Sequence, residues 1–120
     1  MLQTVPRYTI CWLYIVSLLL GNPHFAQSQT VYKGCFEVTT DMTGLITHDS
    51  LTIDIGIEEC YKQGYQFAGL QYGSRYWCSN DIAFLNSNRL TDASCDMDCS
   101  GNNQQKCGGA WRRSIYAIGR

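Results

Sequence analysis

Histidine is scarce in this sequence, and carboxylates paired for catalysis are missing. Only two histidines are present, and the one that follows residue 28, His48, lies in a polar stretch without a nucleophile elbow or a metal motif around it. Glu58 and Glu59 are adjacent and would point to different sides of a helix, which does not suit glycoside hydrolysis. The sequence therefore predicts a protein that is not an enzyme.

Blocks of basic residues and long apolar runs are also missing beyond the first 28 residues. Residues 29–120 contain eight Lys or Arg and ten Asp or Glu, a net charge of about −2, so we expect neither nucleic acid nor an anionic membrane as a partner. No further apolar stretch is long enough to span a membrane, and this part has no acceptor for N-linked glycan. We expect a soluble mature chain with an unmasked surface.

The first 28 residues have the layout of a secretory signal peptide. Arg7 ends a mildly basic start, and an apolar run from Ile10 to Leu20 follows. This eleven-residue run reaches only about 16 Å as a helix, roughly half of the hydrocarbon core of a membrane. Ala26 and Ser28 fit the cleavage positions. We therefore expect a signal peptide at 1–28 and one secreted, extracellular domain at 29–120.

Seven cysteines are present, and Cys11 would leave with the signal peptide. An even number then remains in an oxidising compartment, which indicates disulfides. A domain of this size buries little apolar surface, and each bridge typically contributes about 2–4 kcal/mol, so bridges can decide whether it folds. The remaining cysteines are Cys35, Cys60, Cys78, Cys95, Cys99 and Cys107.

Residue alternation and turn residues predict a mixed domain of helix and strands. Thr52 can cap a helix that Gly64 would end, and Gly73-Ser74 can turn a hairpin in which Trp77 and Cys78 face opposite sides. Residues 80–109 show little periodicity and would depend on disulfides for their order. The predicted elements are strands at 30–36, 65–72, 75–79 and 113–118, a loop at 39–50 and a helix at 53–63.

Five short stretches form an ordered set along the chain: Tyr32-Lys33-Gly34-Cys35-Phe36, Gly64-Tyr65-Gln66-Phe67-Ala68-Gly69-Leu70-Gln71-Tyr72-Gly73, Tyr76-Trp77-Cys78-Ser79-Asn80, Cys99-Ser100-Gly101-Asn102 and Cys107-Gly108-Gly109. Together they resemble the WSC domain, and the resemblance covers about residues 31–116. It implies a small disulfide-rich α+β fold in which a helix packs on a curled antiparallel sheet, similar to PAN and apple modules.

The same resemblance implies carbohydrate binding, with a β-glucan-type polysaccharide or a glycoprotein glycan as the partner. WSC domains occur in cell-wall stress sensors, in fungal wall-associated enzymes and in animal receptors. One alternative is a protein-interaction module of a receptor ectodomain, or a truncated receptor, that contacts an extracellular protein. Another is a small secreted defence or venom protein that only uses the scaffold.

The resemblance also implies how the cysteines pair. WSC domains carry further cysteines at the positions of Gly56 and Tyr76, on the same faces of the helix and strand as Cys60 and Cys78. It therefore implies that this chain keeps a Cys60–Cys78 bridge and has lost the neighbouring disulfide between positions 56 and 76. Gly56 would then leave room for the Tyr76 ring. Three pairings stay open for the other four cysteines, and the first choice is Cys35 with Cys107 and Cys95 with Cys99.

Sugar recognition needs flat aromatic rings against the C–H faces of pyranoses, together with polar groups that bond hydroxyls. The sequence supplies both kinds of residue. Each has a plainer interpretation, because rings in small domains often fill the core and Asn or Asp often stabilise turns. The candidates for glycan binding are Trp77, Trp111, Tyr72, Asn80, Asp81, Asn102 and Arg112.

Two kinds of metal site fit the sequence poorly. The stretch from Asp96 to Gly101 begins like a calcium-binding EF-hand loop, but its twelfth position is Cys107 where such a loop needs Glu. Zinc would need two close cysteine pairs under reducing conditions, and only Cys95 and Cys99 are near each other. The sequence predicts neither a metal nor another cofactor.

Overall fold

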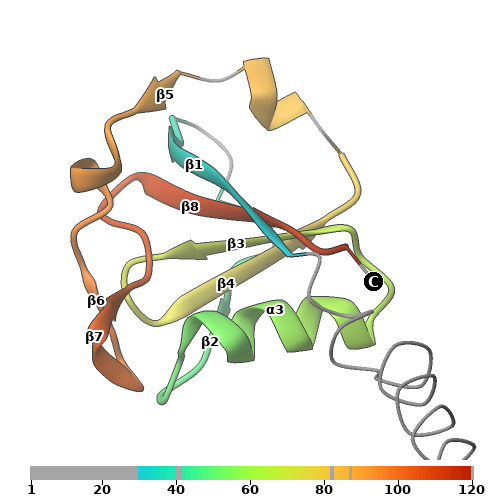
Figure 1. The fold of residues 1–120 in the computed structure, drawn as a ribbon, viewed down its shortest axis with the longest axis horizontal. Helices are drawn as coiled ribbons and strands as arrows, with labels where there is room; N and C mark the ends of the chain where they lie inside the picture. The colour runs from blue at the N-terminus through green and yellow to red at the C-terminus, as the bar shows by residue number, and fades with distance from the viewer. Residues whose placement is uncertain (1–29, 40–41, 82, 87, 120) are drawn as a thin grey trace, which may run out of the picture.

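The computed structural model describes residues 30–119 except 40–41, 82 and 87. The expected signal peptide at 1–28 lies outside the described residues. The rest forms one helix, an antiparallel sheet in the strand order β2-β4-β3-β8-β1-β5, and a separate β6–β7 hairpin (Figure 1). The elements are β1 (Val31–Glu37), β2 (Ile46–Thr47), α3 (Ile53–Lys62), β3 (Phe67–Gln71), β4 (Arg75–Ser79), the 3₁₀ turns η1 (Ala83–Asn86) and η2 (Asp92–Ser94), β5 (Arg89–Leu90), β6 (Asp98–Cys99), β7 (Asn102–Lys106) and β8 (Arg112–Ala117).

The predicted α+β class is confirmed, and the helix starts where its cap predicts. The Thr52 hydroxyl accepts a hydrogen bond from the Ile55 amide at 3.1 Å, which satisfies one of the free donors at the helix start. At the other end Gly64 has φ +84°, a left-handed conformation that glycine adopts without strain. Ile57 and Cys60 lie on the buried face of the helix, whereas Tyr61 is exposed.

The hairpin and the closing strand form the centre of the sheet. β3 pairs with β4 through Gly69 and Trp77, and with β8 through Gly69 and Ile115. The first strand, β1, lies antiparallel beside β8, with Val31 opposite Ala117. The chain therefore enters and leaves the described fold at one end of the sheet, and the β3–β4 turn lies at the other end (Figure 1).

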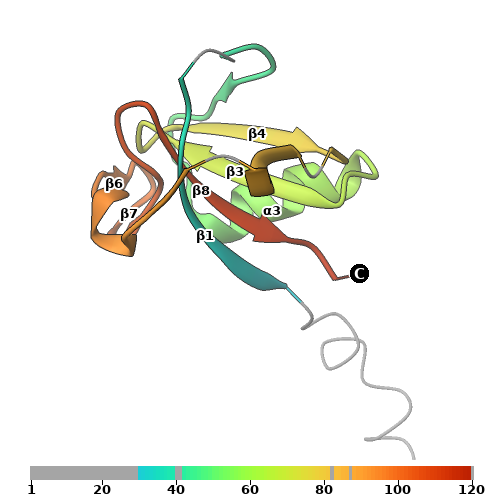
Figure 2. The same ribbon diagram turned by 90° about the horizontal axis from the view of Figure 1, so that it is seen from above.

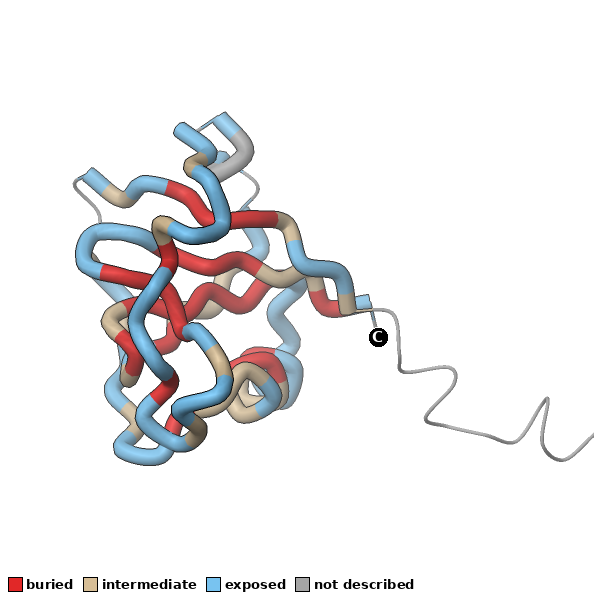
Figure 3. Tube along the Cα trace, turned by 60° about the vertical axis from the view of Figure 1, so that its left-hand side comes forward, coloured by how far each residue is buried: buried red, intermediate tan, exposed pale blue. Residues whose placement is uncertain are grey.

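Two clusters of buried side chains cover the two faces of the sheet. Helix α3 covers one face, where Leu51, Ile57 and Leu70 belong to the larger core (Figure 2). On the opposite face Phe36 and Ile115 belong to a smaller cluster that includes the half-buried Trp77. Figure 3 shows the buried residues concentrated in the central strands and the exposed ones along the outer turns.

The disulfide pairing agrees with the expectation at one bridge and contradicts it at two. Cys60 pairs with Cys78, as expected. The expected Cys35–Cys107 and Cys95–Cys99 bridges are wrong, because the structure pairs Cys35 with Cys95 and Cys99 with Cys107.

The short strands within residues 80–109 explain the correction. In the β1–β5 ladder Leu90 lies opposite Cys35, so the chain that follows β5 reaches Cys35 within a few residues, at Cys95. The β6–β7 hairpin then folds Cys99 back toward Cys107. These strands are two to five residues long and polar, and such segments give no periodic signal from which to predict them.

Candidate functional site

Two aromatic residues hold left-handed backbone conformations at one end of the sheet. Tyr72 has φ 57° and Trp111 has φ 58°, and among the described residues no other residue apart from glycine has positive φ. A left-handed conformation costs about 1–2 kcal/mol for a residue with a side chain, and glycine would remove most of that cost. Strained residues kept against this cost often mark functional sites.

The turns that carry these two residues lie against each other. The Tyr72 amide donates to the carbonyl of Gly109 at 3.4 Å, and Gly109 pairs with Arg112 in the tight turn that contains Trp111. A third segment joins them, because the amide of Met97 donates to the carbonyl of Gly108 at 3.0 Å. We call the exposed and half-exposed side chains that these segments present the tip surface: Tyr72, Arg75, Met97, Trp111 and Arg112.

Trp111 is exposed although a hydrogen bond holds its backbone. Its carbonyl accepts a hydrogen bond from the Val38 amide at 2.9 Å, which ties the turn to the chain after β1. The residue is 52% exposed, as much as any large apolar residue in the described part of the chain. The backbone can therefore hold an open aromatic surface in one position.

Two guanidinium groups belong to the tip surface. The guanidinium carbon of Arg75 lies 5.1 Å from the centre of the Tyr72 ring, within the range of a cation–π contact. Arg112 donates from Nη1 to the carbonyl of Ser94 at 3.1 Å. Each guanidinium has five N–H donors, so both retain donors that could bond hydroxyl or anionic oxygens of a ligand.

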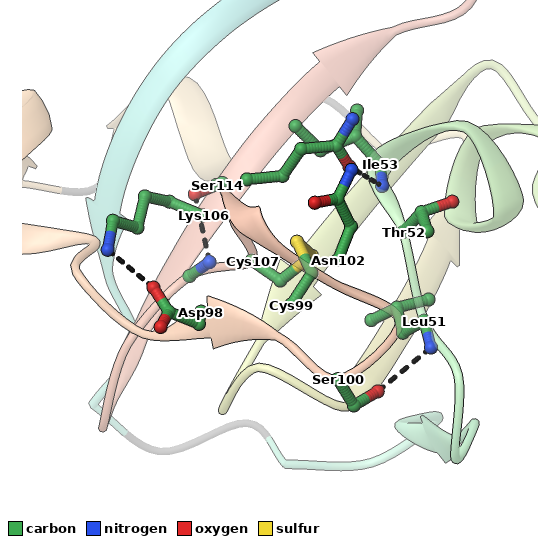
Figure 4. Close-up of a disulfide and its surroundings, with 12 residues drawn as sticks. Leu51, Thr52, Ile53, Asp98, Cys99, Ser100, Asn102, Lys106, Cys107 and Ser114 are labelled. Carbon is green, nitrogen blue, oxygen red and sulfur yellow. Dashed lines mark hydrogen bonds and ion pairs between the residues drawn. A yellow bond between two sulfur atoms is a disulfide. The ribbon is translucent and has the colours of Figure 1, made fainter.

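A disulfide supports the turns that carry the tip surface. The Cys107 carbonyl accepts from the Gly73 amide at 2.9 Å, and Cys107 is bridged to Cys99 (Figure 4). The β6–β7 hairpin is fixed in turn to the start of α3, because the Ser100 hydroxyl and the Gln105 side chain accept the amides of Leu51 and Ile53. The turns thus rest on a covalently closed framework.

Trp77, another candidate for glycan binding, lies elsewhere. It belongs to the sheet face opposite α3 and is half-buried. The guanidinium carbon of Arg113 lies 4.4 Å from its ring centre, so part of the ring is already covered. Trp77 therefore does not join Tyr72 and Trp111 in one surface.

The side chains of the three amide and carboxylate candidates stabilise turns by accepting hydrogen bonds from backbone amides. Asn80 Oδ1 accepts from the Gln66 amide at 2.8 Å, and Asp81 Oδ1 accepts from the Ala83 amide at 2.8 Å. Both follow β4, at the end of the sheet away from the tip surface. Asn102 Oδ1 accepts from the Gln104 amide at 2.9 Å, on the β6–β7 hairpin. The structure brings only Tyr72, Trp111 and Arg112 together out of the seven candidates.

Sequence reasoning missed Arg75 and Met97 as members of the site. Arg75 follows the predicted turn directly and could have been found from that position, since a residue flanking a tight turn lies beside the turn's side chains. Met97 has no such signal. It reaches the Tyr72–Gly73 turn through long-range packing, because a Cβ added at Gly73 would lie 3.8 Å from the Met97 Cβ.

Neither a metal-binding cluster nor a membrane-spanning helix is present among the described residues. No group of three or more His, Cys, Asp or Glu side chains within the described ranges is arranged to hold a metal ion. No helix in that part of the chain is long and apolar enough to cross a membrane.

Comparison with known proteins gives relatives that are much longer than this chain. The chain is 36% identical over 93 residues to a WSC domain-containing protein of Arthroderma benhamiae, which covers 73% of this chain and 10% of that protein. It is 38% identical over 111 residues to Xylosyltransferase oxt of Drosophila melanogaster, covering 88% of this chain and 13% of that protein. It is 30% identical over 91 residues to Kremen protein 2 of Mus musculus, covering 72% of this chain and 20% of that protein.

The chain thus corresponds to a single module within each of these relatives. A protein-family model described as the WSC domain matches residues 32–109, which is more than half of the chain. That segment includes α3, the β3–β4 hairpin and all six described cysteines. The chain belongs to the WSC domain family.

Proposed function

We propose that this chain is an extracellular carbohydrate-binding module that holds its ligand on the tip surface. The observation that carries the proposal is the left-handed backbone of Tyr72 and Trp111 in two turns that touch. Glycine would be less strained at both positions, so the aromatic side chains themselves give a reason for accepting the strain. The WSC resemblance makes a β-glucan-type polysaccharide the first polymer to test.

The chemistry of the tip surface suits a sugar ring. Aromatic faces pack against the apolar C–H faces of pyranoses, and Trp111 is open to such a contact. Hydroxyl groups at the edge of the sugar can accept hydrogen bonds from Arg75 and Arg112. Because the disulfide framework fixes the turns in advance, little conformational entropy is lost when the sugar binds.

The proposal includes the location and class of the protein. We propose a secreted chain with its signal peptide at 1–28, three disulfides in the mature part and no catalytic activity of its own. The xylosyltransferase among the relatives is matched over 13% of its length, so its activity is not carried over to this module. The likeness to PAN and apple modules stays a prediction.

Binding of soluble β-glucan and of a glycan array by the full chain tests this proposal. Trp111→Ala and Tyr72→Ala should each weaken binding at least about tenfold, the loss expected for removing a stacking ring of about 1.4 kcal/mol or more. Tyr65→Ala is the matched control, because Tyr65 is also an exposed aromatic residue but lies away from the tip surface. Absence of binding to every glycan, or equal loss in all three variants, would refute the proposal.

A second candidate function is a contact with a neighbouring protein domain. Val31 is 52% exposed and lies opposite Ala117, at the end where the chain enters and leaves the fold. The exposed Tyr65 is at the same end, since the next residue, Gln66, accepts from the Ile118 amide at 2.8 Å. These two exposed side chains at one end of the sheet favour packing against an adjoining domain. Replacing both should not change glycan binding at the tip surface. Val31→Ser with Tyr65→Ser would separate the two functions.

A further inference from the structure

Arginine is concentrated at the tip end of the sheet. Arg75 is the first residue of β4, and Arg112 and Arg113 are the first two residues of β8, in strands that both flank β3. The helix on the other side carries Asp54, Glu58 and Glu59. A chain of negative net charge therefore places three arginines at one end of its sheet, together with the exposed Trp111 and the half-exposed Tyr72.

We infer that the tip surface prefers an acidic glycan, one whose sugars carry carboxylate or sulfate groups, with Arg75 and Arg112 as the residues that bind the anion. The inference rests on the proposed carbohydrate binding and names the chemical class of the ligand. Arginine suits such groups, because its planar fork can donate two parallel hydrogen bonds to one anionic group. The cation–π contact with Tyr72 favours one placement of the Arg75 guanidinium beside the ring.

The acidic side chains near the tip surface leave these two guanidinium groups available. Asp98 forms an ion pair with Lys106, which neutralises it. Glu37 lies opposite Arg112 in the β1–β8 ladder, yet their charged atoms do not come within 4 Å in the structure. Asp96 is exposed and likewise forms no ion pair at that distance in the described part of the chain.

Arg113 plays a different part from the other two arginines. It is 5% exposed, packs on Trp77 and donates from Nε to Gln71 Oε1 at 3.0 Å. Its charge adds to the positive potential at this end of the sheet, but its guanidinium is too deeply placed to bind a polymer. The contacts to an anionic sugar are therefore assigned to Arg75 and Arg112.

The experiment uses three polymers with one backbone: an unmodified β-glucan, its carboxymethyl derivative and its sulfated derivative. The full chain should bind at least one of the two acidic polymers about tenfold more tightly than the neutral one, a difference worth about 1.4 kcal/mol. Arg75→Gln and Arg112→Gln should each weaken binding of the acidic polymer about threefold more than binding of the neutral one, because glutamine keeps donors for hydroxyl groups but carries no charge. Comparing carboxymethyl with sulfated polymer identifies which anion the site takes.

The control is Lys62→Gln, which removes one positive charge at the end of α3, outside the tip surface. If Lys62→Gln weakens binding of the acidic polymers as much as the arginine variants do, the inference is overturned. A positive charge anywhere on the surface would then attract the polymer equally well. Equal affinity for neutral and acidic polymers that depends on Trp111 would overturn it while leaving the carbohydrate-binding proposal intact. Failure to bind any of the polymers would count against both.

Discussion

The guanidinium of Arg113 stacks on the ring of Trp77 across a glycine. The guanidinium carbon lies 4.4 Å from the ring centre. Gly69 lies opposite Trp77 in β4, and Arg113 in β8 lies opposite Gln71, two residues further along β3. A Cβ built on Gly69 would lie 2.5 Å from Arg113 Cδ and 2.9 Å from Trp77 Cε3. The stack therefore depends on the missing side chain at residue 69.

Gly69→Ala should destabilise the fold by about 1–3 kcal/mol, the usual cost of forcing an extra methyl group into a packed site. Both neighbours would have to move, and the cation–π contact would weaken. Urea unfolding measures the free energy of unfolding, and tryptophan fluorescence reports the environment of Trp77. A Gly69→Ala variant as stable as wild type, with unchanged fluorescence, would show that the stack tolerates the methyl group.

Trp111→Gly should abolish glycan binding and leave the free energy of unfolding nearly unchanged. Glycine removes the left-handed strain of about 1–2 kcal/mol but loses the packing of the half-covered ring and gains entropy in the unfolded chain. These terms oppose each other, so the free energy of unfolding should stay within about 1 kcal/mol of wild type while glycan binding is lost. Trp77→Gly is the contrasting variant, with an expected loss of at least about 3 kcal/mol because that ring is packed. A large destabilisation by Trp111→Gly would indicate that the ring is kept for packing.

Gly56→Cys combined with Tyr76→Cys should form a fourth disulfide beside Cys60–Cys78. A Cβ built on Gly56 lies 3.7 Å from the Tyr76 Cβ, within the range of about 3.5–4.5 Å that a disulfide needs. The nearest obstacle is the Cδ2 methyl group of the buried Leu70, which would have to shift. Mass measurement before and after reduction, with a thiol assay, detects the bridge. Two reactive thiols in the folded variant would contradict this geometry.

The new bridge should add little stability. Cys60–Cys78 already closes the loop between helix and hairpin, with a sequence separation of 18, so the second bridge removes little further entropy from the unfolded chain. The gain should fall well below the roughly 3 kcal/mol of a first bridge across a loop of this size. The variant also loses the buried Tyr76 ring, so it should be no more stable than wild type.

Stability should fall in alkaline solution. Burial, followed by the nearby charges of Asp54 and Asp92, raises the pKa of Tyr116 above its ordinary value of 10.0. Burial, followed by the hydrogen bond to Asp92, likewise raises the pKa of Tyr32, which packs 5.1 Å from the Tyr116 ring. The folded state holds these protons more tightly than the unfolded state, so their stabilising contribution is complete below about pH 10 and is lost at higher pH.

Urea unfolding across this pH range, with phenolate absorbance as a direct record of titration, measures the effect. Tyr116→Phe has no proton to lose and should show a shallower fall than wild type. Tyr65→Phe provides the control, because Tyr65 is exposed and outside this pair. An identical pH dependence in wild type and Tyr116→Phe would mean that Tyr116 does not contribute to the alkaline loss.

Local patterns predicted the elements whose signals lie within a few residues. The Thr52 cap and Gly64 located the helix, and the alternation from Arg75 to Ser79 located β4 with the correct sides for Trp77 and Cys78. They could not predict β5, β6 and β7, because strands this short and polar form only where a neighbouring strand or a disulfide supports them. The wrong pairing of Cys35 and Cys107 followed directly from those missing strands.

The sequence by itself determined the helix with its caps, the central hairpin, the Cys60–Cys78 bridge implied by the WSC resemblance, and the chemical types available for binding a sugar. Only the tertiary structure decided which of those types meet: it gathered Tyr72, Trp111 and Arg112 at one end of the sheet, added Arg75 and Met97, and left Trp77 beneath Arg113. The physical reason is the range of the forces. Caps and alternation act between near neighbours in the chain, whereas the turn at Tyr72 meets the turn at Trp111 only after the sheet, the hairpin and the disulfides have brought them together.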